Sequence, residues 1–77
     1  MPKEKLPQIS GKELIAILEK RGFHIKSQKG SHIKLEGFAG NLKTIVIIPN
    51  HKILKKGTLH DILKFTETSI EQLKELL

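Results

Sequence analysis

The sequence contains no cysteine, tryptophan or tyrosine, and its only large aromatic residues are three phenylalanines. Without cysteine the chain can form neither a disulfide nor a thiolate metal site, which favours a reducing compartment. The longest apolar run, residues 45–49, is far shorter than the roughly 20 residues needed to span a membrane, and no signal peptide is recognisable. We therefore expect a cytoplasmic protein that does not interact with membranes.

Acidic residues are also scarce in the middle of the chain. Residues 20–60 contain nine lysines and arginines but only one acidic residue, Glu36, whereas residues 1–19 are neutral overall and residues 61–77 carry a net charge of −2. The net charge of +6 is therefore concentrated in the central segment. A positive field of this kind attracts polyanions, and nucleic acid is the expected partner.

This shortage of carboxylates limits the chemistry that the basic segment can perform. Magnesium-dependent cleavage of phosphodiesters uses several carboxylates, and the spacing of the four histidines is not typical of a zinc site. Ser31 has no evident base oriented by a third carboxylate, so a serine nucleophile is not indicated. We expect no metal and no cofactor, which leaves acid–base chemistry carried out by side chains.

A chain of 77 residues forms one domain, which we place at residues 9–77 after an N-terminal extension, residues 1–8. Ser10 and Glu13 have the spacing of a capping box, and apolar residues follow at helical spacing until Gly22. The sequence therefore predicts a first helix over about residues 11–21.

Alternating polar and apolar residues then indicate strands. Phe23 and Ile25 should lie on one face of the first strand, opposite His24, Lys26 and Gln28. After a turn at residues 29–30, residues 32–36 alternate again, residues 37–41 form a second expected turn, and residues 42–48 are a β-branched third strand ended by proline.

Two further helices are expected near the C-terminus, capped by Thr58 with Asp61 and by Ser69 with Gln72. The predicted fold is α+β, in the order α-β-β-β-α with a short extra C-terminal helix and a three-stranded antiparallel sheet. The two main helices should cover one face of this sheet, which leaves the other open to solvent. We expect His24, Lys26, His32 and Lys34 on that open face.

A histidine among lysines suits the cleavage of RNA, which carries its own nucleophile in the 2′-hydroxyl. An imidazole with a pKa near 6.5 can transfer one of the two protons, and lysines can stabilise the charge on the phosphate. His32 is the candidate for this role, although a histidine on a strand is more often an ordinary surface residue.

Five groups of residues, in order, resemble the HicA toxins of type II toxin–antitoxin systems over about residues 9–66. They are Ser10-Gly11-Lys12-Glu13-Leu14, Gly22-Phe23, Gly30-Ser31-His32, Pro49-Asn50-His51, and Lys56-Gly57-Thr58-Leu59 with Ile62-Leu63. The resemblance implies a fold similar to a double-stranded RNA-binding domain, and an endoribonuclease that cleaves mRNA and inhibits translation. It also implies that a HicB-type antitoxin neutralises the toxin.

The resemblance places the catalytic histidine of the family at His32. His51 matches a further family histidine, and either His51 or Lys34 could supply the second proton transfer. Gly30 could either form the turn or approach a phosphate. Ser31 could either donate a hydrogen bond to phosphate or orient the turn. The expected RNA contacts are Ser31, Gly30, Lys26, Lys29, Lys34, His51, Lys55 and Lys56.

We expect a monomer when the protein is free and a hetero-oligomer with the antitoxin, which would cover the His32 face with acidic or hydrogen-bonding groups. Two other functions remain open at this point. The chain could be a non-catalytic RNA-binding module, since a fold does not imply an activity. It could also be an inactive toxin that acts as an antitoxin-binding protein.

Overall fold

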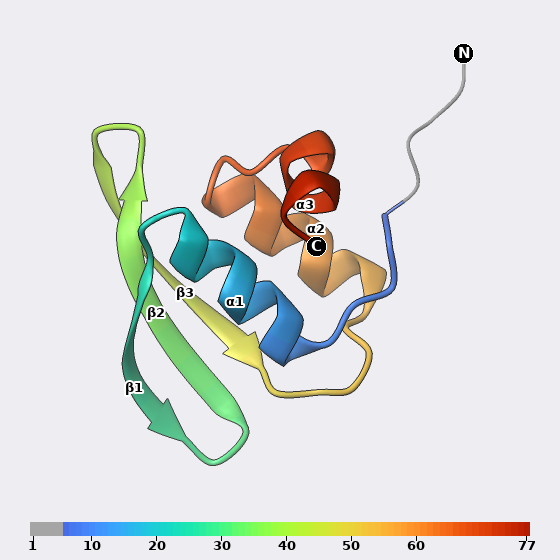
Figure 1. Cartoon of the computed structure of the whole chain (residues 1–77). Coiled ribbons are helices and arrows are strands. Elements are labelled where there is room, and N and C mark those ends of the chain that lie inside the picture. Colours follow the sequence, from blue (N-terminus) through green and yellow to red (C-terminus); the bar gives the residue numbers. More distant parts are fainter. Residues whose placement is uncertain (1–5) are drawn as a thin grey trace.

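The computed structural model describes residues 6–77, which form three helices and one sheet (Figure 1). The elements in chain order are α1 (Gly11–Lys20), β1 (His24–Lys29), β2 (His32–Ala39), β3 (Leu42–Pro49), α2 (Lys56–Phe65) and α3 (Ile70–Leu76). This order confirms the predicted α+β fold of the double-stranded RNA-binding type. Residues 1–5 of the expected extension lie outside the described residues, and Leu6 packs against the core.

The first helix begins where the capping box predicts. The Ser10 hydroxyl accepts a hydrogen bond from the Glu13 N–H at 3.0 Å, and the Ser10 N–H donates to Glu13 Oε1 at 2.9 Å. These bonds satisfy two of the N–H groups that have no partner within the helix. The helix ends at Lys20, and its apolar side, which includes Leu14 and Leu18, is buried.

The three strands form an antiparallel meander in the order β1-β2-β3. Each hairpin turn has two residues and starts with a glycine at positive φ, +59° at Gly30 and +63° at Gly40. The expected turn over residues 37–41 is wrong in extent, because β2 continues to Ala39. Gly37 pairs with Thr44 and lies so close to Phe23 that a Cβ atom would come within 2.6 Å of the phenyl ring.

A β-bulge in β1 changes the predicted faces of that strand. Ile25 pairs with Leu35, but the next pair is Ser27 with Lys34, so Lys26 is an extra residue. An extra residue inverts the alternation beyond it. Gln28 therefore lies opposite Ile33, on the helix side, and its expected place beside His24 and Lys26 is wrong.

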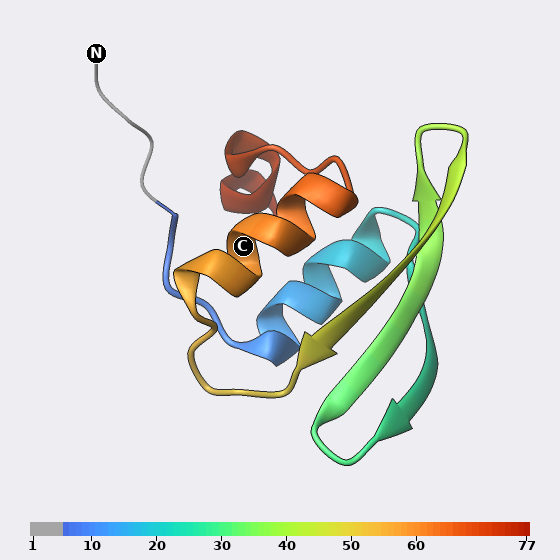
Figure 2. The same ribbon diagram turned by 180° about the vertical axis from the view of Figure 1, so that it is seen from behind.

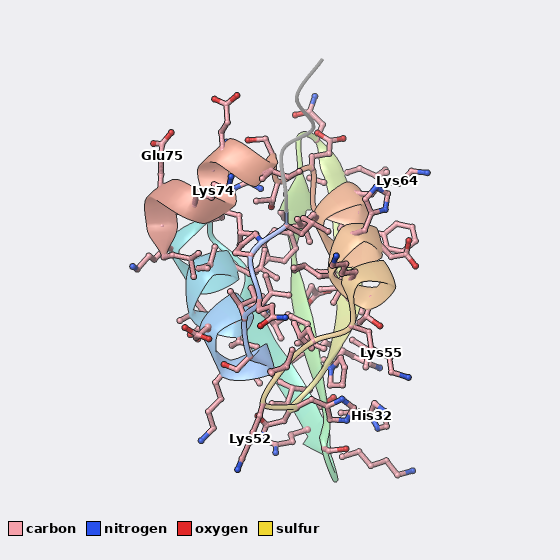
Figure 3. The ribbon with its side chains drawn as sticks, turned by 90° about the vertical axis from the view of Figure 1, so that its right-hand side faces the viewer. His32, Lys52, Lys55, Lys64, Lys74 and Glu75 are labelled. Atoms are coloured by element: carbon pink, nitrogen blue, oxygen red, sulfur yellow. The ribbon has the colours of Figure 1, made fainter. Side chains whose placement is uncertain are left out.

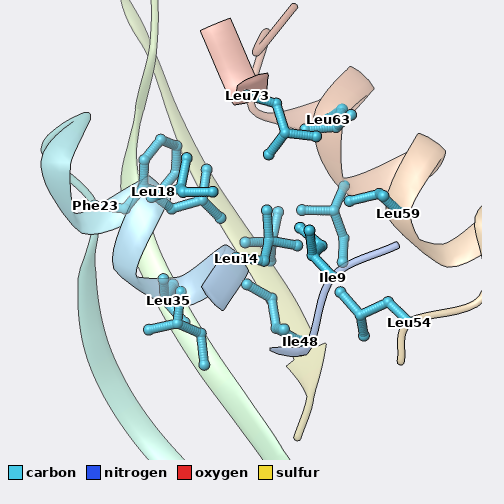
Figure 4. Close-up of a cluster of buried hydrophobic side chains, with 14 of the residues drawn as sticks. Ile9, Leu14, Leu18, Phe23, Leu35, Ile48, Leu54, Leu59, Leu63 and Leu73 are labelled. Carbon is cyan, nitrogen blue, oxygen red and sulfur yellow. The ribbon is translucent and has the colours of Figure 1, made fainter. Parts of the chain in front are cut away.

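The core lies between the sheet and the helices (Figure 4). Leu35 and Ile48 project from β2 and β3 toward Leu14, Leu59 and Leu73, and all five side chains are almost completely inaccessible to solvent. The helices gather on one side of the sheet, so the other face is open, as the views from front and back show (Figures 1 and 2). β1 and β3 are the edge strands of this sheet, and every residue of β1 is exposed.

The last two helices differ in how they begin. Ser69 and Gln72 form the predicted capping box of α3. Thr58 does not cap α2, contrary to expectation: the helix starts earlier, at Lys56, and its N-cap residue Lys55 makes no side-chain capping bond. The earlier start follows from the Leu59 N–H, which already donates to the Lys55 carbonyl at 2.9 Å. Within residues 6–77, none of the helices combines the length and apolarity that crossing a bilayer requires.

Candidate nucleic-acid interface

A hollow of about 430 Å³ lies on the open face, near the turn between β1 and β2. Five side chains line it: Ser27, Lys29, His32, Lys34 and Ile47. The strand register explains why they meet, because His32 pairs with Lys29, and Lys34 pairs with both Ser27 and Ile47. Residues paired across strands share a face, so these side chains project to the same side of the sheet. We call this feature the His32 hollow.

The structure thus brings together three of the predicted site residues, His32, Lys29 and Lys34. Ser27 and Ile47 were not among the predicted residues. Ser27 faces this side only because of the bulge at Lys26, which the alternation in the sequence does not reveal. Ile47 could have been found, since it lies on the outward face of the predicted third strand.

Lys26 also lies on the open face, but it belongs to a second group of charges around Glu36. The Glu36 carboxylate lies 2.7 Å from Lys43 Nζ, 3.5 Å from Lys26 Nζ and 3.6 Å from His24 Nε2. The contact with the Lys43 ammonium is the main cause of a lowered pKa at Glu36, against a smaller opposing effect of burial. The sequence showed no sign that two lysines and a histidine would converge on the single acidic residue of the basic segment.

The turn that carries Gly30 and Ser31 is tied to the loop after β3. The Asn50 N–H donates to the Ser31 carbonyl at 2.7 Å, and the Gly11 N–H donates to the His51 carbonyl at 2.9 Å. Through these bonds, residues 50–51 connect the turn before β2 with the start of α1. The position of His32 at the beginning of β2 is therefore fixed by backbone contacts as well as by strand pairing.

The side chain of His51 does not line the His32 hollow. It lines a separate hollow of about 280 Å³ together with Ser10, Lys12, Asn50 and Lys52. Among residues 6–77 no hydrogen bond or ion pair joins His51 to His32. Of the two candidates for the second proton transfer, only Lys34 shares a hollow with His32.

Lys55 and Lys56 stand at the beginning of α2 and are exposed. Figure 3 shows Lys55 and Lys52 at the same end of the molecule as His32, whereas Lys64, Lys74 and Glu75 lie toward the opposite end. The uncapped start of α2 adds its N–H groups and the positive end of its dipole to this basic end. Nowhere in residues 6–77 do three histidine or acidic side chains converge in a way that could bind a metal ion.

The fold and this face define a small α+β domain of the double-stranded RNA-binding type, with a histidine and two lysines in one hollow of its open sheet. The family model of the HicA toxins of bacterial toxin–antitoxin systems matches residues 11–67. The chain therefore belongs to the HicA toxin family, as its sequence motifs indicate, and it is a toxin of a toxin–antitoxin system. Searches of curated proteins and of solved structures gave no significant match.

Proposed function

We propose that this toxin is a metal-independent endoribonuclease that cleaves mRNA and thereby inhibits translation, with His32 as a catalytic residue. The observation that supports the proposal is the His32 hollow, in which one imidazole and the side chains of Lys29 and Lys34 surround a space of about 430 Å³ on an exposed face. RNA supplies the nucleophile, so the protein has only to move two protons and stabilise charge.

In the proposed reaction, His32 removes the proton from a 2′-hydroxyl, and the 2′-oxygen attacks the adjacent phosphorus. The bond from phosphorus to the 5′-oxygen breaks, and the leaving oxygen takes a proton from the Lys34 ammonium. The products are a 2′,3′-cyclic phosphate and a free 5′-hydroxyl. Lys29 stabilises the negative charge that accumulates on the phosphate oxygens during attack.

The remaining predicted contacts serve binding. Gly30 and Ser31 form the turn beside His32, where the backbone can approach a phosphate closely. Lys55 extends the positive charge around the same end (Figure 3), Lys56 follows it at the start of α2, and His51 lines the separate hollow. With no tryptophan or tyrosine to stack on unpaired bases, the face should bind mainly through the RNA backbone.

The test compares wild type with His32→Ala on a defined RNA, with EDTA present throughout. We expect cleavage by the wild type and a loss of at least 100-fold in the variant, in the range that general acid–base catalysis contributes. His60→Ala is the matched control, because His60 is exposed on α2 and, among residues 6–77, forms an ion pair only with Asp61, at 3.9 Å. Cleavage that survives His32→Ala, or that EDTA abolishes in the wild type, would overturn the mechanism.

The role of Lys34 has its own test. A substrate with sulfur in place of the leaving 5′-oxygen needs no proton donor, because a thiolate is a good leaving group. Lys34→Gln should therefore be slow on normal RNA but close to wild type on the sulfur-containing substrate. His32→Ala should be slow on both substrates. Equal loss by Lys34→Gln on the two substrates would remove Lys34 as the acid.

In the cell, we propose that the domain over residues 9–77 acts in the cytoplasm and that a HicB-type antitoxin covers the His32 face. Acidic groups on the partner would screen Lys29 and Lys34 and exclude RNA. We expect a free monomer and a hetero-oligomer in the complex, which light scattering distinguishes. Induction of the wild type should arrest growth and induction of His32→Ala should not.

A further inference from the structure

The group of charges around Glu36 lies outside the His32 hollow, and the proposed chemistry does not use it. Glu36 is the least exposed member, with a side chain that is 12% accessible, whereas the side chains of Lys26 and Lys43 are 49% and 62% accessible. The carboxylate therefore lies beneath the ammonium groups, and the cations face solvent. Together with His24, we call these residues the Glu36 cluster.

The Glu36 cluster and the His32 hollow lie on one continuous surface. His32, Lys34 and Glu36 alternate along β2 with the buried residues Ile33 and Leu35, so all three face the open side. Four strand residues span about 13 Å, at about 3.3 Å each. This length corresponds to a few nucleotides of a nucleic-acid strand, whose charges are spaced about 3.4 Å apart along the axis of duplex DNA. An RNA strand that occupies the His32 hollow and follows β2 would reach the Glu36 cluster.

We propose that the Glu36 cluster is a second phosphate-binding subsite for the RNA strand, and that Glu36 limits the affinity of this subsite. The proposal rests on the proposed function for the identity of its ligand. Each lysine ammonium has three N–H donors, so a contact with Glu36 leaves donors of Lys26 and Lys43 free for a phosphate. The carboxylate cancels one of the two lysine charges, so the subsite stays positive but weak.

The ion pairs of the Glu36 cluster contribute little to the stability of the fold. The Glu36 carboxylate is largely shielded from solvent, but the side chains of Lys26 and Lys43 are about half exposed, so water screens much of the attraction in each ion pair. Variants that change one charge at the cluster should therefore fold. This allows the cluster to be tested by binding alone, without reference to cleavage.

The experiment measures binding of a fluorescent 12-nucleotide 2′-O-methyl RNA, which cannot be cleaved through its 2′-oxygen, by anisotropy over a range of salt concentrations. Glu36→Gln should bind about two- to fivefold more tightly than wild type, with a salt dependence steeper by about 0.7, the value for one additional contact to a single strand. Lys43→Gln should bind more weakly, with a shallower salt dependence.

Glu75→Gln and Lys74→Gln are the matched controls, because they make the same charge changes on α3, away from the open face (Figure 3). They should change binding by less than half as much. A 2′-O-methyl dinucleotide, which fills the His32 hollow but does not reach Glu36, should bind wild type and Glu36→Gln equally.

Three results would overturn the subsite. They are a Glu36→Gln affinity equal to or below that of wild type, an effect no larger than that of Glu75→Gln, and the same effect on the dinucleotide as on the 12-nucleotide RNA. These results would leave the ribonuclease proposal intact, because His32-dependent cleavage is measured separately. Absence of binding to any RNA would overturn both.

Discussion

Gly11 is the position where the structure predicts the largest effect of adding a single methyl group. A Cβ atom built on Gly11 would lie 2.1 Å from the Pro49 carbonyl oxygen and 3.1 Å from the Asn50 Cα. Real Cβ atoms keep at least 3.0 Å from such neighbours, and both neighbours are backbone atoms that cannot rotate away. Gly11→Ala therefore forces the start of α1 away from the end of β3.

Three terms determine how Gly11→Ala changes the free energy of unfolding. Overpacking costs about 1–3 kcal/mol, and the hydrogen bond from the Gly11 N–H to the His51 carbonyl, worth about 1 kcal/mol, is lost or weakened. Replacing a glycine returns about 0.4–1 kcal/mol by restricting the unfolded chain. The net loss is about 1–3.6 kcal/mol. At about 4–8 °C per kcal/mol for a domain of this size, the Tm should fall by roughly 4–29 °C.

Thermal unfolding followed by circular dichroism measures this change, and Gly57→Ala is the control. Gly57 also lies in the first turn of a helix, but no atom comes within 4 Å of its added Cβ, so alanine there should leave the Tm unchanged or raise it. A Gly11→Ala protein as stable as wild type would refute the close approach of α1 to β3. Weaker RNA cleavage below its Tm is also expected, since residues 50–51 hold the turn before His32.

Two further predictions concern helix caps and pH. Ser10→Ala and Ser69→Ala should each cost about 1 kcal/mol of stability, because each removes a capping box, and urea unfolding will show whether either is neutral. The pKa of Glu36 is lowered in the folded protein, first of all by Lys43. The ionised carboxylate therefore stabilises the fold at pH values above its ordinary pKa of 4.5, and this contribution is lost as the pH falls through the lowered pKa. The stability difference between wild type and Glu36→Gln should therefore be largest above pH 4.5 and shrink in more acidic buffer. A difference that grows toward low pH would contradict the sign.

Features determined by local contacts could be predicted from the sequence. The capping boxes at Ser10 and Ser69 each join a hydroxyl and a side chain three residues apart, so their helices begin where the sequence places them. The first hairpin was predicted from alternation and from Gly30, which adopts the positive φ that its turn requires. His32 and Lys34 were placed on the open face for the same reason.

Features that depend on tertiary contacts could not be predicted in this way. The bulge at Lys26 is specified by pairing with β2, so the outward position of Ser27 and the inward position of Gln28 were missed. The turn at Gly37 was wrong because a glycine there accommodates the ring of Phe23 rather than a reversal of the chain. Threonine is a residue type that often caps helices, but α2 begins before Thr58 because of backbone contacts at Lys55.

The meander has a consequence for the order in which the protein folds. Each strand pairs with its neighbour in the sequence through a turn of two residues, so the sheet face forms by closing very short loops, at small entropic cost. The contact between α1 and α3, by contrast, joins residues far apart in the sequence and closes a long loop: Lys20 Nζ lies 3.4 Å from the Leu76 carbonyl oxygen. We therefore expect the strands that carry His32 and Glu36 to pair before α1 and α3 meet, so the surface expected to meet RNA or antitoxin would form ahead of the complete core.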